Sequence, residues 1–309
     1  NKKEVFMVEK CTVQSDYDGL TLEIMYLVPD NKKIKGVVQI SHGMSEHKER
    51  YLDFMKYLGA NGYVSVIHDH RGHGASVKDS RDLGYFYTND ETVLARDLYT
   101  VTEFIKKKYP DLPITLFSHS MGTLVARNYL QKYDDKIDKL VLCGPPTKNQ
   151  LAVIGIGLSK ICSLFVGDKK PNKLLDTMTF STYNKGFKEK NAWLSLNKDN
   201  VYKYNNDTLC GFTFTTNGFY ILYKLLVRAY QKQSYLVKNA KLPMLIIAGS
   251  DDPVIGSLNK LYDLQCFLRA LGYKNVDVKI YDKLRHELLL EDRKYGVYED
   301  VLTFLENNN

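Results

Sequence analysis

Long apolar runs are missing from this chain of 309 residues. Its most apolar stretch, Leu151 to Val166, is interrupted by Lys160 and two serines and is shorter than the roughly 20 apolar residues that span a bilayer. The sequence therefore predicts no transmembrane helix. The first residues, Asn1 to Lys10, alternate charged and apolar side chains and show no signal peptide. The sequence leaves open whether a leader was removed before Asn1.

Cysteines and nucleotide-binding motifs are also sparse. The five cysteines lie far apart, are odd in number and form neither a Cys-x-x-Cys pair nor a zinc spacing: Cys11, Cys143, Cys162, Cys210 and Cys266. We therefore expect reduced thiols and a cytoplasmic location. Gly155-x-Gly157 lacks a third glycine, and no Gly-x-x-x-x-Gly-Lys run occurs, so the sequence predicts no nucleotide cofactor.

The positive charge is small and concentrated in one segment. The net charge is +7, which does not by itself indicate nucleic-acid binding when no recognition motif is present. Between Leu151 and Lys238 there are 13 lysines and arginines against five aspartates and glutamates, and the rest of the chain is nearly neutral. The segment could attract an anionic lipid surface, or its lysines could simply form a solvated face.

Short Val- and Ile-rich runs alternate with segments of helical period. The expected strands are Gly36 to Ser41, Tyr63 to His68, Ile114 to Ser118, Lys139 to Cys143, Met244 to Ala248 and Val276 to Tyr281. Strands joined by helices predict a mostly parallel sheet with helices on both faces, which is an α/β fold. Before them, Thr12 to Tyr17 and Leu20 to Val28 flank Asp18-Gly19, which predicts an antiparallel N-terminal hairpin.

The alternation stops after Gly144-Pro145-Pro146 and resumes at Pro243. The stretch between them has no clear strand, is rich in lysine and holds 14 aromatic residues, including the single tryptophan, Trp193. It is typical of a helical insertion over the strand ends, where open α/β sheets bind ligands. The predicted organisation is a core of residues 1–146 and 240–309 with a cap of residues 147–239.

The pentapeptide from Ser118 to Gly122 (Ser-His-Ser-Met-Gly) lies between an expected strand and an expected helix. A sharp strand-to-helix turn raises one side chain above the sheet and directs helix N–H groups toward it, which suits a nucleophilic serine at Ser120. Ser118 stands where glycine is usual and would crowd the turn slightly. The alternative is a serine-rich helix cap.

Two further residues follow strand ends later in the chain. Asp251-Asp252-Pro253 comes after the strand from Met244, and His286 comes after the strand from Val276. A serine, an acid and a histidine therefore occur in the order of the α/β-hydrolases, each at a strand's carboxyl end. The adjacent aspartates leave an ambiguity, because neighbouring residues in an extended turn point apart and only one should reach His286.

With these motifs the chain resembles the monoacylglycerol lipase and lysophospholipase branch of the α/β-hydrolases over nearly its whole length. The motifs are Ser41-His42-Gly43-Met44-Ser45-Glu46-His47, His68-Asp69-His70-Arg71-Gly72-His73-Gly74-Ala75-Ser76, Ser118 to Gly122, Gly249 to Val254 and Arg285-His286-Glu287. The resemblance implies an α/β-hydrolase fold, with Ser120 as nucleophile, His286 as general base and acid, and Asp252 as orienting carboxylate. It also implies that the backbone N–H groups of Met44 and Met121 form the oxyanion hole, and that no cofactor is needed.

Three other interpretations compete with this one. His68-x-His70 and His73 are similar to a metallo-hydrolase motif, but Gly72 stands where that motif needs Asp, so we expect no metal there. A hydrolase fold kept as a binding protein would not require all three of Ser120, Asp252 and His286. A serine aminopeptidase shares the core motifs but should offer carboxylates to a substrate ammonium, and the insertion is rich in lysine instead.

The insertion also bears on the substrate. Its apolar residues could line an acyl-chain pocket or lie against a lipid surface, and the candidates are Leu151, Ile154, Phe212, Phe214 and Phe219. The alternative is that they pack the cap onto the core. The expected substrate is a monoacylglycerol, a lysophospholipid or a related acyl ester, with transient contact between the basic cap and an anionic membrane. Acyl length, head group and oligomeric state are not determined by the sequence.

Overall fold

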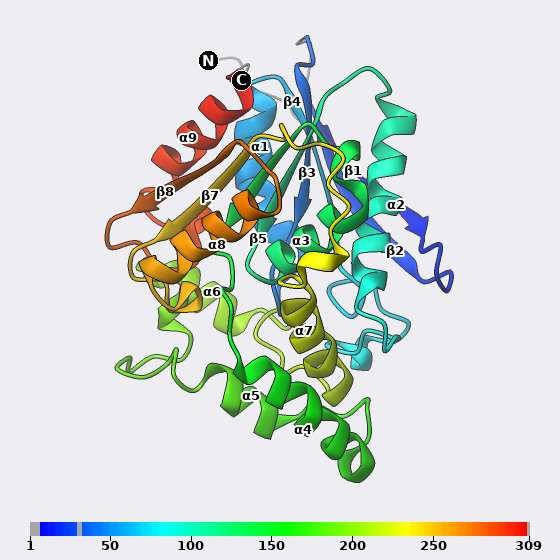
Figure 1. Cartoon of the computed structure of the whole chain (residues 1–309), viewed down its shortest axis with the longest axis vertical. Helices are drawn as coiled ribbons and strands as arrows, with labels where there is room; N and C mark the ends of the chain where they lie inside the picture. Colours follow the sequence, from blue (N-terminus) through cyan, green and yellow to red (C-terminus); the bar gives the residue numbers. More distant parts are fainter. Residues whose placement is uncertain (1–6, 30–32, 308–309) are drawn as a thin grey trace.

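A computed structural model describes residues 7–29 and 33–307, and it is built around one eight-stranded sheet (Figure 1). The spatial order is β1-β2-β4-β3-β5-β6-β7-β8. β1 and β2 run antiparallel to their neighbours, and every later pairing is parallel. The strands are β1 (Met7–Gln14), β2 (Thr21–Val28), β3 (Gly36–Ser41), β4 (Tyr63–His68), β5 (Ile114–His119), β6 (Lys139–Cys143), β7 (Met244–Gly249) and β8 (Val276–Tyr281).

The predicted parallel strands are found where expected, with β5 and β7 one residue longer. The hairpin also forms, but its first strand is Met7–Gln14 instead of Thr12 to Tyr17. The reason is a wider turn: the Ser15 N–H donates to the Leu20 carbonyl at 2.8 Å, and the Gly19 N–H donates to the Ser15 carbonyl at 3.0 Å. Asp18-Gly19 therefore lies inside a six-residue connection. The part of the Asn1 to Lys10 expectation that falls on residues 1–6 lies outside the described residues.

Helices cover both faces of the sheet, as the alternating pattern predicts (Figure 1). Side chains of α1 (Leu52–Ala60) and α9 (Lys294–Glu306) share one buried cluster with alternate residues of the strands. Side chains of α2 (Thr92–Lys108), α3 (Met121–Tyr133) and α8 (Leu258–Ala270) fill the cluster on the other face. Because both faces are covered, β3, β4, β5 and β7 are buried at every residue instead of at every second one.

The segment between β6 and β7 is helical and lies at the carboxyl ends of the strands (Figure 1). It contains α4 (Leu151–Val166), α5 (Lys173–Phe180), α6 (Lys198–Asn206) and α7 (Thr216–Arg228). α7 packs against α4 on one side and against α3 of the core on the other. Buried Glu291 accepts hydrogen bonds from the N–H groups of Leu196 and Asn197, which fixes a cap turn to the core. We refer to residues 147–239 as the cap, and its status as a separate domain stays a prediction.

Within the described residues, no helix is both long enough and apolar enough to cross a membrane. The apolar helix α4 has 16 residues.

Candidate active site

Three loops at the carboxyl edge of the sheet bring together the residues that the sequence singled out. Ser120 follows β5, Asp252 follows β7 and His286 follows β8. β5 and β7 each lie next to β6, and β8 lies next to β7. Their loops therefore open onto the same edge, and side chains separated by up to 166 positions meet there.

Ser120 lies in a strained turn between β5 and α3. Its backbone has φ +52° and ψ −121°, a conformation that residues with a side chain rarely adopt. Its hydroxyl does not cap α3, so the helix-cap alternative does not describe this residue. Gly122 is needed for the turn, because a Cβ there would lie 2.2 Å from the Ser41 carbonyl oxygen. Ser118 fits in place of glycine because its buried hydroxyl donates to the Val141 carbonyl at 2.8 Å.

His286 is hydrogen-bonded on both ring nitrogens. Nε2 lies 2.8 Å from Ser120 Oγ, and Nδ1 lies 2.8 Å from Asp252 Oδ2. A carboxylate only accepts, so Nδ1 carries the proton and Nε2 accepts from the serine. Asp252 is buried, and its other oxygen accepts the Val254 N–H at 2.8 Å. Asp251 is exposed and contacts the Ser250 hydroxyl, so the structure pairs Asp252, not Asp251, with the histidine.

Met44 and Met121 flank Ser120 at the wall of a cavity. Met121 is the first residue of α3, where helix N–H groups have no partner within the helix. Among the described residues, neither backbone N–H is paired with another protein group. Gly43 lets the loop approach closely, since a Cβ there would lie 3.1 Å from Ser120 Cβ and 2.7 Å from Glu46 Oε1. Both amides are therefore free to bind a substrate oxygen.

A buried ionic network supports these loops from behind. Glu46 Oε1 accepts from the Gly43 N–H at 2.5 Å and lies 3.2 Å from His119 Nδ1. His119 Nε2 in turn lies 3.3 Å from the His286 carbonyl oxygen. Arg50 joins Glu46 to Glu287, the residue after the histidine, at 2.7 and 2.6 Å. One carboxylate thus links the Met44 loop, the serine turn and the histidine loop.

The charges of this network depend on one another. Burial alone would lower the pKa of His119, but its hydrogen bond to Glu46 and the charge of that carboxylate outweigh burial and raise it. Burial alone would raise the pKa of Glu46, but His119 and Arg50 hold it well below its usual range. Both shifts favour the charged forms, and both ring nitrogens of His119 face acceptor oxygens, so these contacts favour a protonated imidazole directly before Ser120 in the chain.

The cap covers His286 with Trp193. The indole ring centroid lies 5.3 Å from that of His286, and Tyr183 packs on the indole at 5.1 Å. Arg285 donates to the Ala192 carbonyl at 2.7 Å, which holds this part of the cap in place. The cap thus shields the histidine ring from solvent.

Ser120 opens into a cavity of about 260 Å³ between the core and the cap. One part of its wall is apolar and comes mainly from α4, α5 and α7: Leu151, Ile154, Met178, Phe180, Leu222 and Leu226. Another part is polar: Asn149, Asp176, Asn184, Lys190 and Asn191. The cavity suits a ligand with a hydrocarbon chain and a polar group.

The five predicted cap residues divide between two places. Leu151, Ile154 and Phe212 line the cavity. Phe214 and Phe219 do not; they are fully buried and pack on each other at 5.8 Å, and Phe214 also packs on Phe86. Phe214 and Phe219 therefore pack the cap onto the core, which is the alternative to the expected substrate contact.

The histidine-rich loops are hydrogen-bonded internally. His42 Nε2 accepts from the His70 N–H, His70 Nε2 lies 3.0 Å from Ser41 Oγ, and His73 Nε2 accepts from the Ser45 N–H. Burial lowers the pKa of His68 and of His73 to about 3, so both rings are neutral. The roles of Glu46, His119 and Glu287 were missed by the sequence interpretation, although all three stand inside its motifs.

The family model for serine aminopeptidase, S33 matches residues 32–293. Mouse (Mus musculus) monoglyceride lipase is 29% identical over 247 residues, covering 78% of this chain and 72% of its own. The monoglyceride lipase homolog of monkeypox virus is 25% identical over 275 residues, covering 88% and 90%. A carboxyl esterase from Bacillus coagulans, solved in complex with glycerol, superposes with a TM-score of 0.88 at 26% identity and covers 96% of this chain and 97% of its own.

These likenesses span both parts of the core and the cap. The chain belongs to the serine aminopeptidase S33 family and is an α/β-hydrolase enzyme of the monoacylglycerol lipase-like branch.

Proposed function

We propose that the chain hydrolyses carboxylic esters through Ser120, His286 and Asp252. The observation that carries this proposal is the position of the His286 ring, 2.8 Å from the serine hydroxyl and 2.8 Å from the buried carboxylate, beside a cavity with two free backbone N–H groups. A nucleophile, a base and a group that orients the base are the parts needed for acyl transfer.

In the first half-reaction, Ser120 Oγ attacks the acyl carbonyl carbon while His286 Nε2 takes its proton. The carbonyl oxygen becomes an anion that the N–H groups of Met44 and Met121 bind. Asp252 holds the tautomer and stabilises the imidazolium. His286 then returns the proton to the departing alkoxide oxygen, which leaves as the alcohol, and the acyl group remains as an ester on Ser120.

In the second half-reaction, a water molecule replaces the alcohol. His286 takes a proton from the water, whose oxygen attacks the acyl carbon, and the same two amides bind the second oxyanion. The bond from the acyl carbon to Ser120 Oγ breaks, and the proton passes from His286 to the serine. The products are a fatty acid and regenerated enzyme, and the cycle uses no redox step.

Labelling with a fluorophosphonate tests this proposal against a non-catalytic binding protein. We expect one label per folded chain and none in Ser120→Ala, with equal circular dichroism spectra. The control is Ser118→Ala, which removes a neighbouring buried hydroxyl and should keep the label. Absence of labelling in folded wild-type protein would contradict the catalytic proposal.

Monoacylglycerols and lysophospholipids are the substrate classes that we favour. The apolar wall of α4, α5 and α7 suits one acyl chain, the polar wall suits a small hydroxylated head group, and relatives of comparable length carry the name monoglyceride lipase. p-Nitrophenyl esters of rising acyl length, monoacylglycerols and lysophospholipids should be compared by kcat/KM. A preference for acetyl esters over all long-chain substrates would contradict the lipid assignment.

The rival activity, an aminopeptidase, would need a carboxylate for the substrate ammonium. Asp176 lines the cavity and is the cap residue placed for that role. Burial raises its pKa, and Lys190, which also lines the cavity, adds a competing positive charge. We therefore expect aminoacyl anilides to be poor substrates. Efficient anilide cleavage that falls sharply in Asp176→Asn would favour the peptidase.

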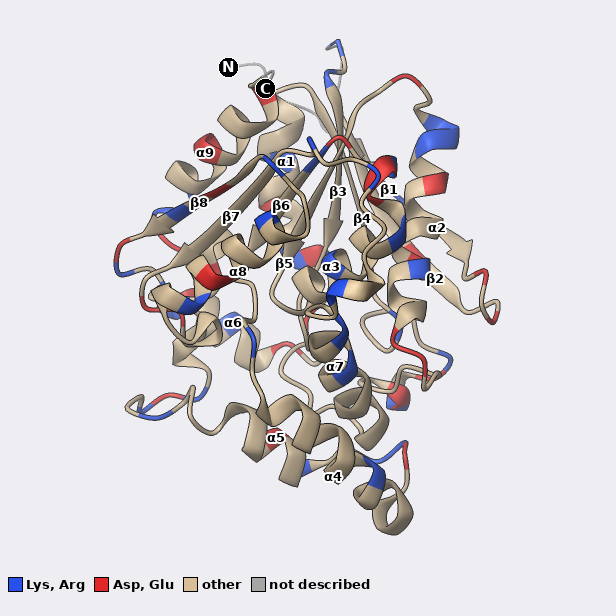
Figure 2. Cartoon of the chain, viewed as in Figure 1, with Lys and Arg blue, Asp and Glu red and all other residues tan. Residues whose placement is uncertain are grey.

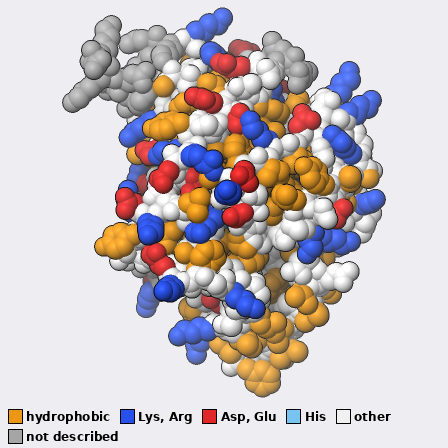
Figure 3. Space-filling model, turned by 90° about the vertical axis from the view of Figure 1, so that its left-hand side faces the viewer, with side chains coloured by type: hydrophobic (Ala, Val, Ile, Leu, Met, Phe, Trp, Pro, Cys, Tyr) orange, Lys and Arg blue, Asp and Glu red, His pale blue; other side chains and the backbone are white. Residues whose placement is uncertain are grey.

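We also propose that the cap rests on an anionic lipid surface through α4. Its outer face exposes Leu164 at 82% and Phe165 at 84%, and Leu151 at 66% is shared with the cavity wall. Figure 2 shows few charges on α4 and α5, and Figure 3 shows hydrophobic side chains gathered at this end of the molecule. Lys160, Lys169 and Lys173 lie on or near these two helices, and each could add about 1 kcal/mol at an anionic surface.

Vesicle binding tests the membrane proposal. Phosphatidylglycerol vesicles should bind the protein more tightly than phosphatidylcholine vesicles do, and added salt should weaken the difference. The double variant Leu164→Gln with Phe165→Gln should lose binding while hydrolysing a soluble short-chain ester at the wild-type rate. The exposed pair Leu258→Gln and Tyr262→Gln on α8 is the control. Equal binding by both double variants would contradict a role of α4.

A further inference from the structure

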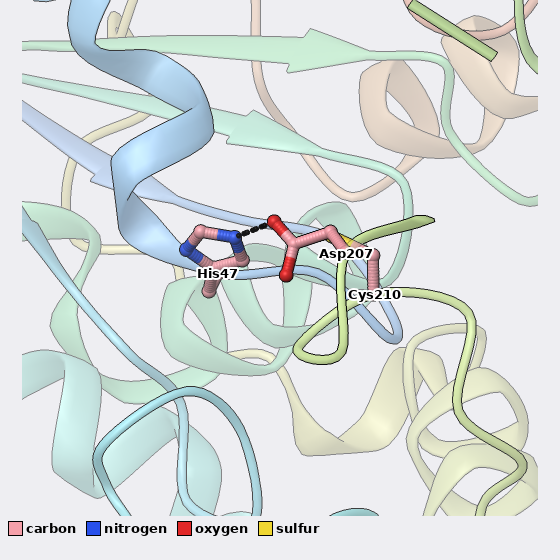
Figure 4. A group of neighbouring side chains, drawn as sticks. All are labelled: His47, Asp207 and Cys210. Carbon is pink, nitrogen blue, oxygen red and sulfur yellow. Dashed lines mark hydrogen bonds and ion pairs between the residues drawn. The ribbon is translucent and has the colours of Figure 1, made fainter. Parts of the chain in front are cut away.

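A histidine, a carboxylate and a thiol converge outside the proposed catalytic site. They are His47, Asp207 and Cys210, whose potential ligand atoms all lie within 4.8 Å of one another. Figure 4 shows His47 joined to Asp207, with Cys210 beside the carboxylate. His47 ends the loop that carries Met44, whereas the other two belong to the cap turn after α6. The cluster therefore bridges core and cap.

The cap turn presents two ligand atoms at close spacing. Asp207 and Cys210 are three positions apart, and the Cys210 N–H donates to the Asp207 carbonyl at 3.0 Å. Asp207 Oδ1 accepts the Leu209 N–H at 2.8 Å, which fixes the carboxylate. Structural zinc sites commonly take two ligands from one tight turn, with two residues between them in the sequence.

His47 has the outer partner that a metal-bound histidine usually has. Its Nδ1 lies 2.7 Å from Glu49 Oε2, and its Nε2 faces Asp207 Oδ2 at 2.8 Å. A carboxylate on the far nitrogen fixes the tautomer and raises the basicity of the nitrogen that binds the metal. Lys10 holds Glu49 in turn, at 2.9 Å.

The surrounding charges leave room for a cation. Arg50, which is close to Cys210, is matched by Glu46 and Glu287. Lys48 is matched by Asp69 at 2.5 Å. Among the described residues, Asp207 has no ion-pair partner other than His47. Its side chain is 35% exposed, which gives an ion a path from solvent.

We propose that His47 Nε2, an Asp207 oxygen and Cys210 Sγ bind one zinc ion, with water as the fourth ligand. The ion replaces the proton between His47 and Asp207 and the thiol proton, and both protons pass to solvent. Zinc ligands lie roughly 4 Å apart or less, so the cluster must contract by up to about 1 Å. Imidazole, thiolate and carboxylate together favour zinc over magnesium or calcium.

Bound zinc would fasten the cap turn to the loop of Met44. The two segments already share two hydrogen bonds, from the Gly211 N–H to the Ser45 carbonyl at 2.9 Å and from the Ser45 hydroxyl to the Phe212 carbonyl at 2.7 Å. Phe212 lines the cavity, so the ion would stiffen one of its walls. The site does not require the proposed hydrolysis, and binding is measured without substrate.

Titration of the full-length, metal-stripped protein with buffered zinc tests the proposal. We expect one tight equivalent in the wild type and at least tenfold weaker binding in Cys210→Ser and in Asp207→Asn. Cys266→Ser, which changes an exposed thiol elsewhere, is the matched control and should bind as the wild type does. Glu49→Ala should weaken binding by roughly 10–100-fold without removing a ligand.

Cobalt gives a second readout that is independent of stability. Co²⁺ bound to the wild type should show a thiolate charge-transfer band and the visible bands of a four-coordinate ion, and the charge-transfer band should vanish in Cys210→Ser. Circular dichroism and thermal melting of metal-free variants separate lost ligands from lost folding. Absence of zinc binding in folded wild type, or equal binding in Cys210→Ser, would overturn the proposal.

Discussion

The sheet edge and the cap differ in which kind of side chain they bury and which kind they expose. At the sheet edge, polar side chains such as Asp252, His286 and Glu46 are buried and have fixed partners. In the cap, apolar side chains such as Leu164 and Phe165 are exposed and have little to pack on. A buried polar network holds one geometry, whereas an exposed apolar helix can meet surfaces of many shapes. We infer that the edge determines the reaction and that the cap determines which ester reaches it.

The sharpest test of this division is a matched pair of neighbouring aspartates. Asp252→Asn should lower kcat by about 10⁴ on every ester, because the amide favours the wrong tautomer of His286. Asp251→Asn changes an exposed side chain that does not contact the histidine, and it should change kcat less than twofold. Rates on a short and a long ester measure both. A loss confined to one chain length would contradict an edge that acts on all substrates alike.

A pair of glycines compares the packing of the two regions. Gly122→Ala places a Cβ 2.2 Å from the Ser41 carbonyl, so it should cost about 3 kcal/mol or more of unfolding free energy. Gly157→Ala, in α4, meets nothing within 4 Å and should stabilise the chain by up to about 1 kcal/mol through helix propensity. Urea denaturation measures both. Equal effects would mean that the edge is no more tightly packed than the cap.

The same division explains what the sequence could predict. Strand patterns placed β3, β4, β6 and β8 at their observed bounds. The first three are buried on nearly every residue, as expected for strands covered on both faces, whereas the edge strand β8 alternates apolar and charged residues. The order of Ser120, Asp252 and His286 after strand ends indicated that they would meet. The resemblance selected Asp252 over Asp251, and Asp252 is the residue that contacts His286.

What the sequence could not predict depends on contacts across long separations. Phe212 and Phe214 are two positions apart and equally apolar, yet one lines the cavity and the other is buried against Phe86. Glu46 and His119 form an ion pair across 73 positions, and no local pattern encodes that pairing. The Asp-Gly pair indicated the position of the hairpin turn correctly, but the first strand ends earlier than expected. The hydrogen bonds of Ser15 close a longer turn than the pair alone predicts.

Acyl-chain selection should respond to changes in the cap alone. Leu226→Trp fills part of the apolar wall on α7, so it should lower kcat/KM on long-chain esters by roughly 10–100-fold, since each displaced methylene is worth about 1–3 kcal/mol. Short-chain esters should react as before, because the sheet edge is unchanged. A panel of p-nitrophenyl esters gives the profile. A uniform loss across all lengths would show that the cap also determines the reaction geometry.

The smallest effect expected concerns the pH dependence of stability at the sheet edge. Glu46 raises the pKa of His119 in the folded chain, so the stabilisation is complete below the unfolded value of about 6.5 and is lost as pH rises through the folded pKa. Neutral His68 and His73 act in the opposite direction, and stability falls as pH drops below about 6.5. His119→Gln removes only the first contribution. Its melting temperature should therefore fall less than that of the wild type between pH 6 and pH 9, because the other titrating groups are common to both proteins. Parallel curves would mean that Glu46 does not raise the pKa of His119 in the folded chain.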